Sequence, residues 1–197
     1  GLSYAYYLAD KGYNIIIHDL SDQACKVYGE AKSVDEILIK LNKKGSSSKF
    51  YECDLTDSND VNDFVSRILK DYNDIDVLIN NAGGDIKGDD KMAAGGKASF
   101  NNFFLAEGDF STIYNRNFLS TLNMCRTVGS LMKKRQKGKI LNISSVSGGF
   151  GVEKESAYAL AKASIIHLTR CLATELRPYG INVNCIAPGA TRTGRFL

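Results

Sequence analysis

Tyr158 and Lys162, four residues apart, form a pair whose types and spacing could carry out chemistry. On an α-helix, residues at this spacing lie on one face. A lysine ammonium beside a phenol favours the phenolate, so the pKa of such a tyrosine falls from about 10 toward neutrality. The phenol could then exchange a proton with an alcohol or a carbonyl oxygen.

The spacing alone is weak evidence, because the sequence contains it three times. The pairs are Tyr7 and Lys11, Tyr28 and Lys32, and Tyr158 and Lys162. Taken singly, each is typical of an aromatic residue beside a solvated lysine on a helix. The third pair differs in its context. Ser145 lies thirteen residues before Tyr158, at the end of an apolar run, and a glycine-rich link joins the two.

The elements that must position these side chains alternate between strands and helices. Short apolar runs predict strands near residues 14–18, 49–53, 75–79, 139–143 and 181–186, and helical spacing predicts helices over 2–11, 21–44, 61–69, 109–135 and 156–177. Continuously apolar strands are typical of strands buried on both faces. The sequence therefore predicts an α/β fold, a doubly wound, Rossmann-type parallel sheet flanked by helices.

Polar residues and glycines follow the ends of several predicted strands. They are Asp19, Asp54, Asn80 to Gly83, Ser144, Ser145 and the segment from Ala187 to Thr193. In open parallel sheets, ligands bind beyond the carboxyl ends of the strands. These positions are therefore candidate binding residues.

The composition limits the class of protein. The 197 residues carry a formal charge of +3, with 44% hydrophobic and 24% charged residues, which excludes a disordered or fibrous protein and argues against a nucleic-acid partner. No apolar run reaches the ~18 residues that span a bilayer, so we expect no membrane association. Five scattered cysteines without a Cys-x-x-Cys pair predict reduced, mostly buried thiols of a cytoplasmic protein, with no disulfide and no metal site.

Both ends of the chain look cut, because it starts at Gly1 without an initiator methionine and ends at Leu197 soon after a strand-like segment. We expect one domain over residues 1–197, truncated at both ends and lacking its first strand and its C-terminal end.

Residues 84–104 interrupt the alternation of strands and helices and are expected to form a loop insertion near the substrate site. Its aromatic residues, Phe100, Phe103 and Phe104, either line that site or pack together in a surface loop.

Taken together and in this order, the motifs resemble the short-chain dehydrogenase/reductase family, in its compact single-domain branch. The resemblance runs from Gly1 to about Thr193. The matching motifs are Asn80-Asn81-Ala82-Gly83, Asn117, Ser145, Tyr158-x-x-x-Lys162 and Pro188-Gly189-x-x-x-Thr193. Each is weak by itself, whereas the ordered set is specific. One departure is Ser120, which stands where the family usually has glycine.

The resemblance implies a catalytic tetrad. Tyr158 would be the general acid/base, and Lys162 would lower its pKa and hydrogen-bond the nicotinamide ribose. Ser145 would hold the substrate oxygen; Ser144 is its rival, and the thirteen-residue spacing to Tyr158 favours Ser145. Asn117 would position a proton-relay water. The substrate oxygen would be held in place while hydride passes between the nicotinamide and the adjoining carbon.

The resemblance also implies which residues hold the dinucleotide. Gly1 fits the last glycine of the phosphate loop that opens the first helix. Asp54 would hydrogen-bond the adenine ring with Leu55 beside it, and a second interpretation of Asp54 is a helix N-cap. The remaining contacts would come from Asn81, Ala82 and Gly83 near the adenosine ribose, from Pro188 and Gly189, and from Thr193 at the carboxamide.

Asp19 bears on the choice of cofactor. It lies eighteen residues after Gly1, close to the ~20 expected for an acid that binds a ribose 2′-hydroxyl. Its carboxylate would repel a 2′-phosphate, and no arginine follows it, so the resemblance implies NAD rather than NADP. The alternative is a helix cap at Asp19 or Ser21.

The predicted function is therefore that of an NAD-dependent oxidoreductase interconverting a secondary alcohol and a ketone. The resemblance adds a homo-oligomer, a tetramer or dimer, built through the helices that bear Asn117 and Tyr158. Two alternatives are a nucleotide-sugar epimerase or dehydratase and a dinucleotide-binding regulator without turnover.

Overall fold

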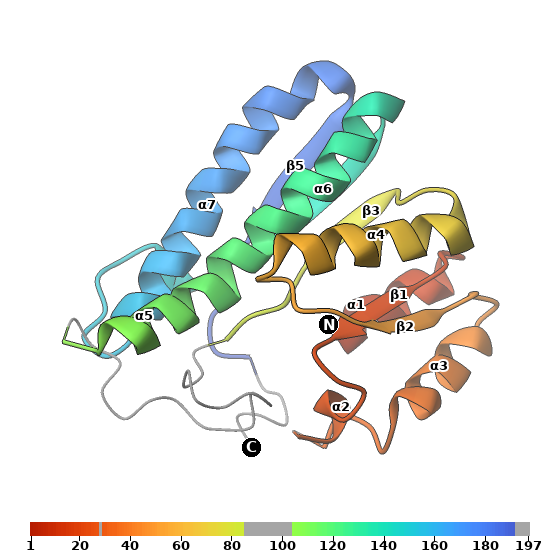
Figure 1. Ribbon diagram of the computed structural model, residues 1–197, viewed down its shortest axis with the longest axis horizontal. Helices are drawn as coiled ribbons and strands as arrows, with labels where there is room; N and C mark the ends of the chain where they lie inside the picture. The colour runs from red at the N-terminus through yellow and green to blue at the C-terminus, as the bar shows by residue number, and fades with distance from the viewer. Residues whose placement is uncertain (28, 85–103, 192–197) are drawn as a thin grey trace.

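All strands of the computed structural model pair in parallel within the residues it describes, 1–27, 29–84 and 104–191 (Figure 1). β1 (Ile16–Asp19) pairs with β2 (Lys49–Glu52), with Ile16 opposite Lys49. β4 (Gly138–Ile143) lies between β3 (Val77–Asn80) and β5 (Ile181–Ile186). The described strands thus form two parallel sheets, one of two strands and one of three, in agreement with the predicted Rossmann-type fold.

Helices connect the strands and cover the sheets. They are α1 (Leu2–Asp10), α2 (Ala24–Val27), α3 (Val34–Asn42), α4 (Ser58–Tyr72), α5 (Glu107–Tyr114), α6 (Ser120–Arg135) and α7 (Ser156–Leu176). One apolar core joins α4, α6 and the end of α7 to β2 through β5, and a smaller one joins α1 and α3 to the residues around β1. Phe64 of α4 and Val128 of α6 are almost completely buried in the first core.

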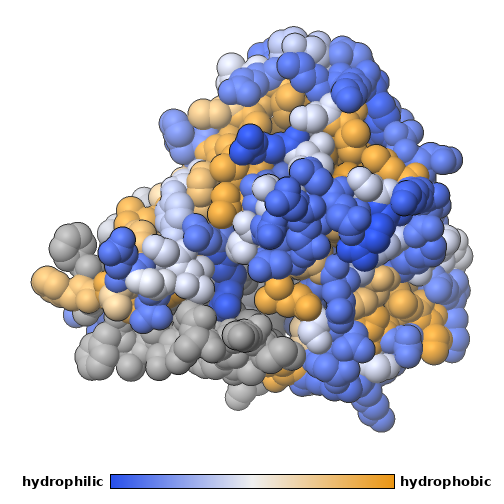
Figure 2. Space-filling model, viewed as in Figure 1, coloured by the Kyte–Doolittle hydropathy of each residue, from blue (hydrophilic) through white to orange (hydrophobic). Residues whose placement is uncertain are grey.

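The space-filling view shows the same face of the molecule from outside (Figure 2). Hydrophilic side chains dominate over α4, and apolar ones gather beside α6 and α7 and again near α3. The described helices include no stretch that is long and apolar enough to cross a membrane.

The predicted helix over residues 21–44 is wrong, because two short helices replace it. α2 ends at Val27, and Gly29 then takes a positive φ of 65°, which interrupts helical hydrogen bonding. α3 starts afresh after Ser33, whose hydroxyl accepts a hydrogen bond of 3.2 Å from the Glu36 amide. The Ser33 cap therefore starts a second helix inside a stretch for which apolar periodicity alone predicted one continuous helix.

The predicted helix over residues 109–135 is longer and is interrupted by a π-helical turn. α5 starts at Glu107, the π-turn covers Asn115–Leu119, and α6 follows directly. Such turns insert one extra residue per turn and often occur at functional sites. Asn117 lies at the centre of this turn and is fully buried.

A buried chain of polar side chains fixes the three-stranded sheet to α7. Asn80 of β3 donates a 2.8 Å hydrogen bond to the side-chain oxygen of Asn142 in β4. The Asn142 amide in turn donates 2.9 Å to the hydroxyl of Thr169 in α7. Buried amides and hydroxyls with satisfied hydrogen bonds fix the relative position of the elements that carry them. The ends of β3 and β4 are therefore held against the helix that bears Tyr158 and Lys162.

Candidate active site

The side chain of Lys162 contacts the carboxyl end of β4. It is only 4% exposed, and its ammonium donates a 3.0 Å hydrogen bond to the backbone carbonyl of Ile143, the last residue of that strand. Burial removes the ammonium from water and lowers the pKa of Lys162 from 10.5 to about 8. Lys162 is thus a buried cation that remains mostly charged at neutral pH.

Tyr158 lies one helical turn before Lys162 on α7 and is half-buried. The Lys162 ammonium stands 5.4 Å from the centre of the Tyr158 ring. A cation at this distance from the ring centre is attracted to the π-electron face of the ring. The structure thus brings together the two side chains that the sequence pairs.

Ser145 lies two residues after Ile143, the last residue of β4 and the one that binds the Lys162 ammonium. Its side chain is 9% exposed and caps the short turn Val146–Gly148, where it accepts a 3.2 Å hydrogen bond from the Ser147 amide. The hydroxyl proton of Ser145 is not needed for this contact, so it can be donated to a ligand oxygen. Its neighbour Ser144 donates 2.7 Å to the backbone carbonyl of Lys162. The hydroxyl of Ser144 thus donates to the helix backbone, whereas that of Ser145 accepts from the turn that follows it.

Asn117 enters from the π-turn between α5 and α6. Its amide nitrogen donates 2.8 Å to the Ile113 carbonyl and 2.9 Å to the Gly84 carbonyl, and its buried side-chain oxygen has no hydrogen-bond partner among the described residues. Gly83 packs against that oxygen, since a Cβ on Gly83 would lie 2.5 Å from it. Asn117 therefore fixes the loop that follows β3.

A hydrogen bond between α5 and α7 brings the Asn117 segment to the tyrosine helix. The Tyr114 hydroxyl lies 3.0 Å from the Ser164 hydroxyl. Tyr114 precedes Asn117 by three residues, and Ser164 follows Lys162 by two. The structure thus brings α5, the π-turn, the end of β4 and α7 together around one site.

Several of the predicted dinucleotide residues follow the ends of strands, and Gly1 precedes α1. Gly1 lies beside the loop after β3, since a Cβ on Gly1 would be 3.4 Å from the side-chain nitrogen (Nδ2) of Asn81. Asn81, Ala82 and Gly83 are exposed. Asp19, the last residue of β1, is also exposed, and its carboxylate accepts a 2.8 Å hydrogen bond from the Leu20 amide.

Asp54 and Leu55 follow β2. Asp54 is not the helix cap: α4 is capped by Asp57, whose carboxylate accepts from the Asn59 amide at 2.7 Å. Asp54 instead accepts hydrogen bonds from the amide and hydroxyl of Thr56, at 2.9 and 2.7 Å. Because Asp57 satisfies the free amides of the helix, the exposed Asp54 keeps acceptor capacity for a ligand.

The segment after β5 returns to the Ser145 turn. The Pro188 carbonyl accepts a 3.0 Å hydrogen bond from the Val146 amide, and Gly189 is exposed beside it. Thr193, Phe100 and Phe103 lie outside the described residues, as does nearly all of the 84–104 segment. Phe104 is 88% exposed.

A family model described as "short chain dehydrogenase" matches residues 1–196 of this chain. The chain belongs to that family. Its members bind a nicotinamide dinucleotide and act as oxidoreductases on alcohols and carbonyl compounds. This short-chain dehydrogenase is 31% identical to a cyclohexanol dehydrogenase of Rhodococcus sp. strain TK6, in an alignment that covers all of this chain and 72% of that enzyme.

Solved structures give the same assignment of the fold. An NAD+-bound xylitol dehydrogenase superposes with a TM-score of 0.81 at 28% identity, over 96% of this chain and 65% of that one. ElxO with NADP bound superposes with a TM-score of 0.79 at 26% identity, over 98% of this chain and 71% of that one. This short-chain dehydrogenase thus spans 65% to 72% of the length of these three proteins.

Sequence reasoning missed two positioning features of the short-chain dehydrogenase. One is the Ser144 contact with the helix backbone, and the other is the Asn80–Asn142–Thr169 chain. The signal for the second was present, since Asn142 interrupts an otherwise apolar strand, and a buried polar residue needs partners. No pattern in the sequence reveals which way the Ser144 hydroxyl points.

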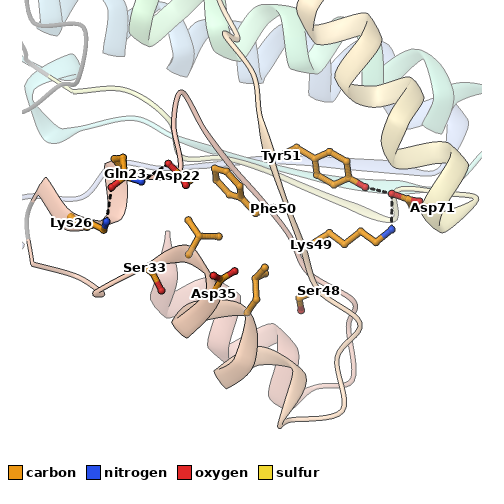
Figure 3. A pocket seen from close by; sticks show the side chains of 12 residues that line it. Asp22, Gln23, Lys26, Ser33, Asp35, Ser48, Lys49, Phe50, Tyr51 and Asp71 are labelled. Carbon is orange, nitrogen blue, oxygen red and sulfur yellow. Dashed lines mark hydrogen bonds and ion pairs between the residues drawn. The ribbon is translucent and has the colours of Figure 1, made fainter.

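A hollow of about 430 Å³ lies apart from these residues, between α2, α3 and the outer edge of β2 (Figure 3). Two of its charged groups form an ion pair: Asp71 binds the Lys49 ammonium at 2.9 Å, and it also accepts from the Tyr51 hydroxyl. It contains none of the predicted site residues. Within the described residues no cluster of three acidic, histidine or cysteine side chains could hold a metal ion.

All five cysteines are free thiols in the structure, and the expectation that most are buried is wrong. Cys53 and Cys125 are buried, and burial raises the pKa of each thiol to about 12. Cys171 is exposed on α7, and the other two are partly exposed. Cysteines on helix and strand surfaces cannot be told from core cysteines by composition.

Proposed function

We propose that this protein is an NAD-dependent oxidoreductase that interconverts a secondary alcohol and a ketone, with Tyr158 as its general acid/base. The observation that carries the proposal is the buried Lys162 ammonium, 5.4 Å from the centre of the Tyr158 ring. Burying an ammonium is costly. A protein that only binds a dinucleotide gains nothing from a cation placed against a phenol, whereas a proton-transferring enzyme does.

The proton follows a short path in each direction. During alcohol oxidation, the Tyr158 phenolate takes the hydroxyl proton of the substrate while the carbinol carbon gives up hydride. During ketone reduction, the phenol returns the proton to the oxygen. The Lys162 ammonium lowers the energy of the phenolate, and the Ser145 hydroxyl donates to the substrate oxygen and fixes its position. Asn117 positions a water molecule that connects the site with solvent.

The residues present fit a dinucleotide. In the exposed Asn81–Gly83 segment, Ala82 has only a methyl side chain and Gly83 has none, so a ligand can approach the backbone closely. Gly1 beside Asn81 provides the same close approach. Asp19, Asp54, Leu55, Pro188, Gly189 and Thr193 complete the proposed set. When bound, the nicotinamide ring accepts or donates the hydride, and the chain contributes position and charge.

Asp19 supports NAD rather than NADP. An exposed carboxylate at the end of β1 can accept hydrogen bonds from a ribose 2′-hydroxyl and repels a 2′-phosphate. The similar structures include both choices, since xylitol dehydrogenase has NAD+ bound and ElxO has NADP bound. The charge at this one position therefore supports the assignment.

The likeness to enzymes of cyclohexanol and xylitol indicates which substrates to test. The assay follows NADH absorbance with cyclic ketones, linear ketones and ketoses, with NADPH in parallel, and the corresponding alcohols in reverse. We expect turnover with at least one ketone and faster turnover with NADH. Tight NADH binding without turnover of any substrate would instead favour a dinucleotide-binding regulator. A small-molecule substrate and a homo-oligomer formed through the helices of Asn117 and Tyr158 are part of the proposal.

A further inference from the structure

Ser144 is a buried hydroxyl that the proposed mechanism does not use. It is 3% exposed and follows Ile143 at the end of β4. Its hydroxyl donates a 2.7 Å hydrogen bond to the backbone carbonyl of Lys162, and its amide donates 2.8 Å to the Ile186 carbonyl at the end of β5. One residue thus joins two strands to the helix of the proposed active site.

Together with Ile143, Ser144 holds Lys162 at both ends. The Ile143 carbonyl accepts from the Lys162 ammonium at 3.0 Å, and the Ser144 hydroxyl binds the Lys162 backbone. The first contact fixes the tip of the side chain, and the second fixes the helical turn from which it extends. The backbone carbonyl can accept both a helical amide and a hydroxyl, because it has two lone pairs.

The same helical turn is in contact with the Ser145 turn. A Cβ on Gly148 would lie 2.7 Å from both the Lys162 carbonyl carbon and the Ala163 amide nitrogen, so the backbone of Val146–Gly148 packs directly on α7. Ser145 caps that turn. A shift of α7 relative to β4 therefore alters the positions of Ser145, Tyr158 and Lys162 relative to one another.

We propose that Ser144 is a positioning residue. Its hydrogen bond to the Lys162 backbone fixes the position of the Tyr158–Lys162 turn relative to the end of β4. This inference rests on the proposed function. A merely structural hydroxyl at this place would contribute to stability and nothing to catalysis. A positioning hydroxyl has a larger effect on the rate, because a shift of ~1 Å at a reacting group can cost ~100-fold.

Three substitutions separate these cases. Ser144→Ala removes the hydroxyl, Ser144→Cys keeps a similar size with a weak donor, and Ser144→Thr keeps the hydroxyl. We expect kcat to fall at least ~10-fold in the alanine and cysteine variants, with the KM for NADH within ~2-fold and substantial recovery in the threonine variant. The control is Ser46→Ala, which removes a buried hydroxyl, 2.7 Å from the Ser48 hydroxyl, before β2.

A second measurement does not depend on enzymatic activity. Competitive acylation of lysines across pH, read by mass spectrometry, reports the pKa and the accessibility of Lys162. In Ser144→Ala we expect the turn to loosen and admit water, so the pKa of Lys162 rises from about 8 by ~0.5 or more and its acylation becomes several-fold faster. Ser46→Ala should leave both unchanged.

The outcomes distinguish this inference from the proposed function. Wild-type kcat and unchanged Lys162 labelling in Ser144→Ala would overturn the positioning role, even where Tyr158→Phe abolishes turnover. Equal losses in the alanine and threonine variants would also overturn it, because the hydroxyl would then be irrelevant. Full activity in Tyr158→Phe would overturn the proposed function instead, while the labelling result would still decide whether Ser144 positions Lys162.

Discussion

The Lys162 ammonium donates a 3.0 Å hydrogen bond to the Ile143 carbonyl at the last residue of β4. This contact holds the charged end of a helix side chain at the carboxyl ends of the parallel strands, where ligands bind in folds of this type. It places the cation between the backbone of the sheet and the Tyr158 ring. The arrangement is unfavourable for an isolated ammonium and useful beside an ionising phenol.

The burial of Lys162 predicts a specific dependence of stability on pH. The pKa of Lys162 is about 8 in the folded protein against 10.5 in its ordinary state, so between these values the unfolded chain binds more protons. Relative to Lys162→Met, the wild type should gain up to about 3 kcal/mol of unfolding free energy as pH rises from 8 to 10.5, and nothing below pH 8. Urea denaturation of both proteins across this range measures the difference. A constant difference would contradict the burial of a charged Lys162.

The charge of Asp19 predicts the cofactor preference. Asp19→Asn removes the repulsion of a 2′-phosphate and weakens the contact with a 2′-hydroxyl. We expect the ratio of kcat/KM for NADH over NADPH to fall by ~10-fold to ~100-fold, equivalent to about 1–3 kcal/mol. The control is Asp22→Asn, another exposed carboxylate three residues later. An unchanged ratio in Asp19→Asn would show that other groups select the cofactor.

The close packing of Gly83 on Asn117 predicts that no side chain is tolerated there. Gly83 has a φ of 130°, and an added Cβ would lie 2.5 Å from the Asn117 oxygen. Gly83→Ala should cost about 2–4 kcal/mol of stability and reduce turnover. Gly108→Ala is the matched control, because its Cβ would meet nothing within 4 Å and α5 should gain up to about 1 kcal/mol. Thermal unfolding of both variants tests this, and equal melting temperatures would refute it.

The buried amide of Asn142 predicts a large cost of removal. Asn142→Ala would leave the Asn80 amide with only the weak sulfur acceptor of Cys125, and the Thr169 hydroxyl without its donor. We expect a loss of about 2–4 kcal/mol in unfolding free energy. Asn182→Ala, on the exposed side of β5, should change it by less than about 0.5 kcal/mol. Similar losses in the two variants would mean that the chain of amides is not stabilising.

The strands and the long helices could be predicted because their patterns were strong. The strand predicted over residues 181–186 is β5, and the helix predicted over 156–177 is α7 with one residue fewer. The failure at residues 21–44 has a local cause, since Gly29 and the Ser33 cap interrupt a polar sequence whose apolar spacing alone is ambiguous.

The side chains around the site could be predicted only in part. The pairing of Tyr158 with Lys162 follows from helical spacing. Their contact with the end of β4, which precedes Ser145, follows from the parallel fold. The π-turn at Asn117 and the direction of the Ser144 hydroxyl depend on tertiary packing, which no short-range pattern encodes. For the same reason, the sequence could not tell whether Asp54 or Asp57 caps α4.

The role of Tyr158 in proton transfer is tested most directly by hydride transfer in a single turnover. Wild type and Tyr158→Phe are loaded with NADH and mixed with the best ketone, and the loss of NADH absorbance is followed. We predict that the variant transfers hydride at least ~100-fold more slowly while its Kd for NADH stays within ~3-fold of wild type. A rate in Tyr158→Phe within ~3-fold of wild type, with NADH bound, would contradict the account.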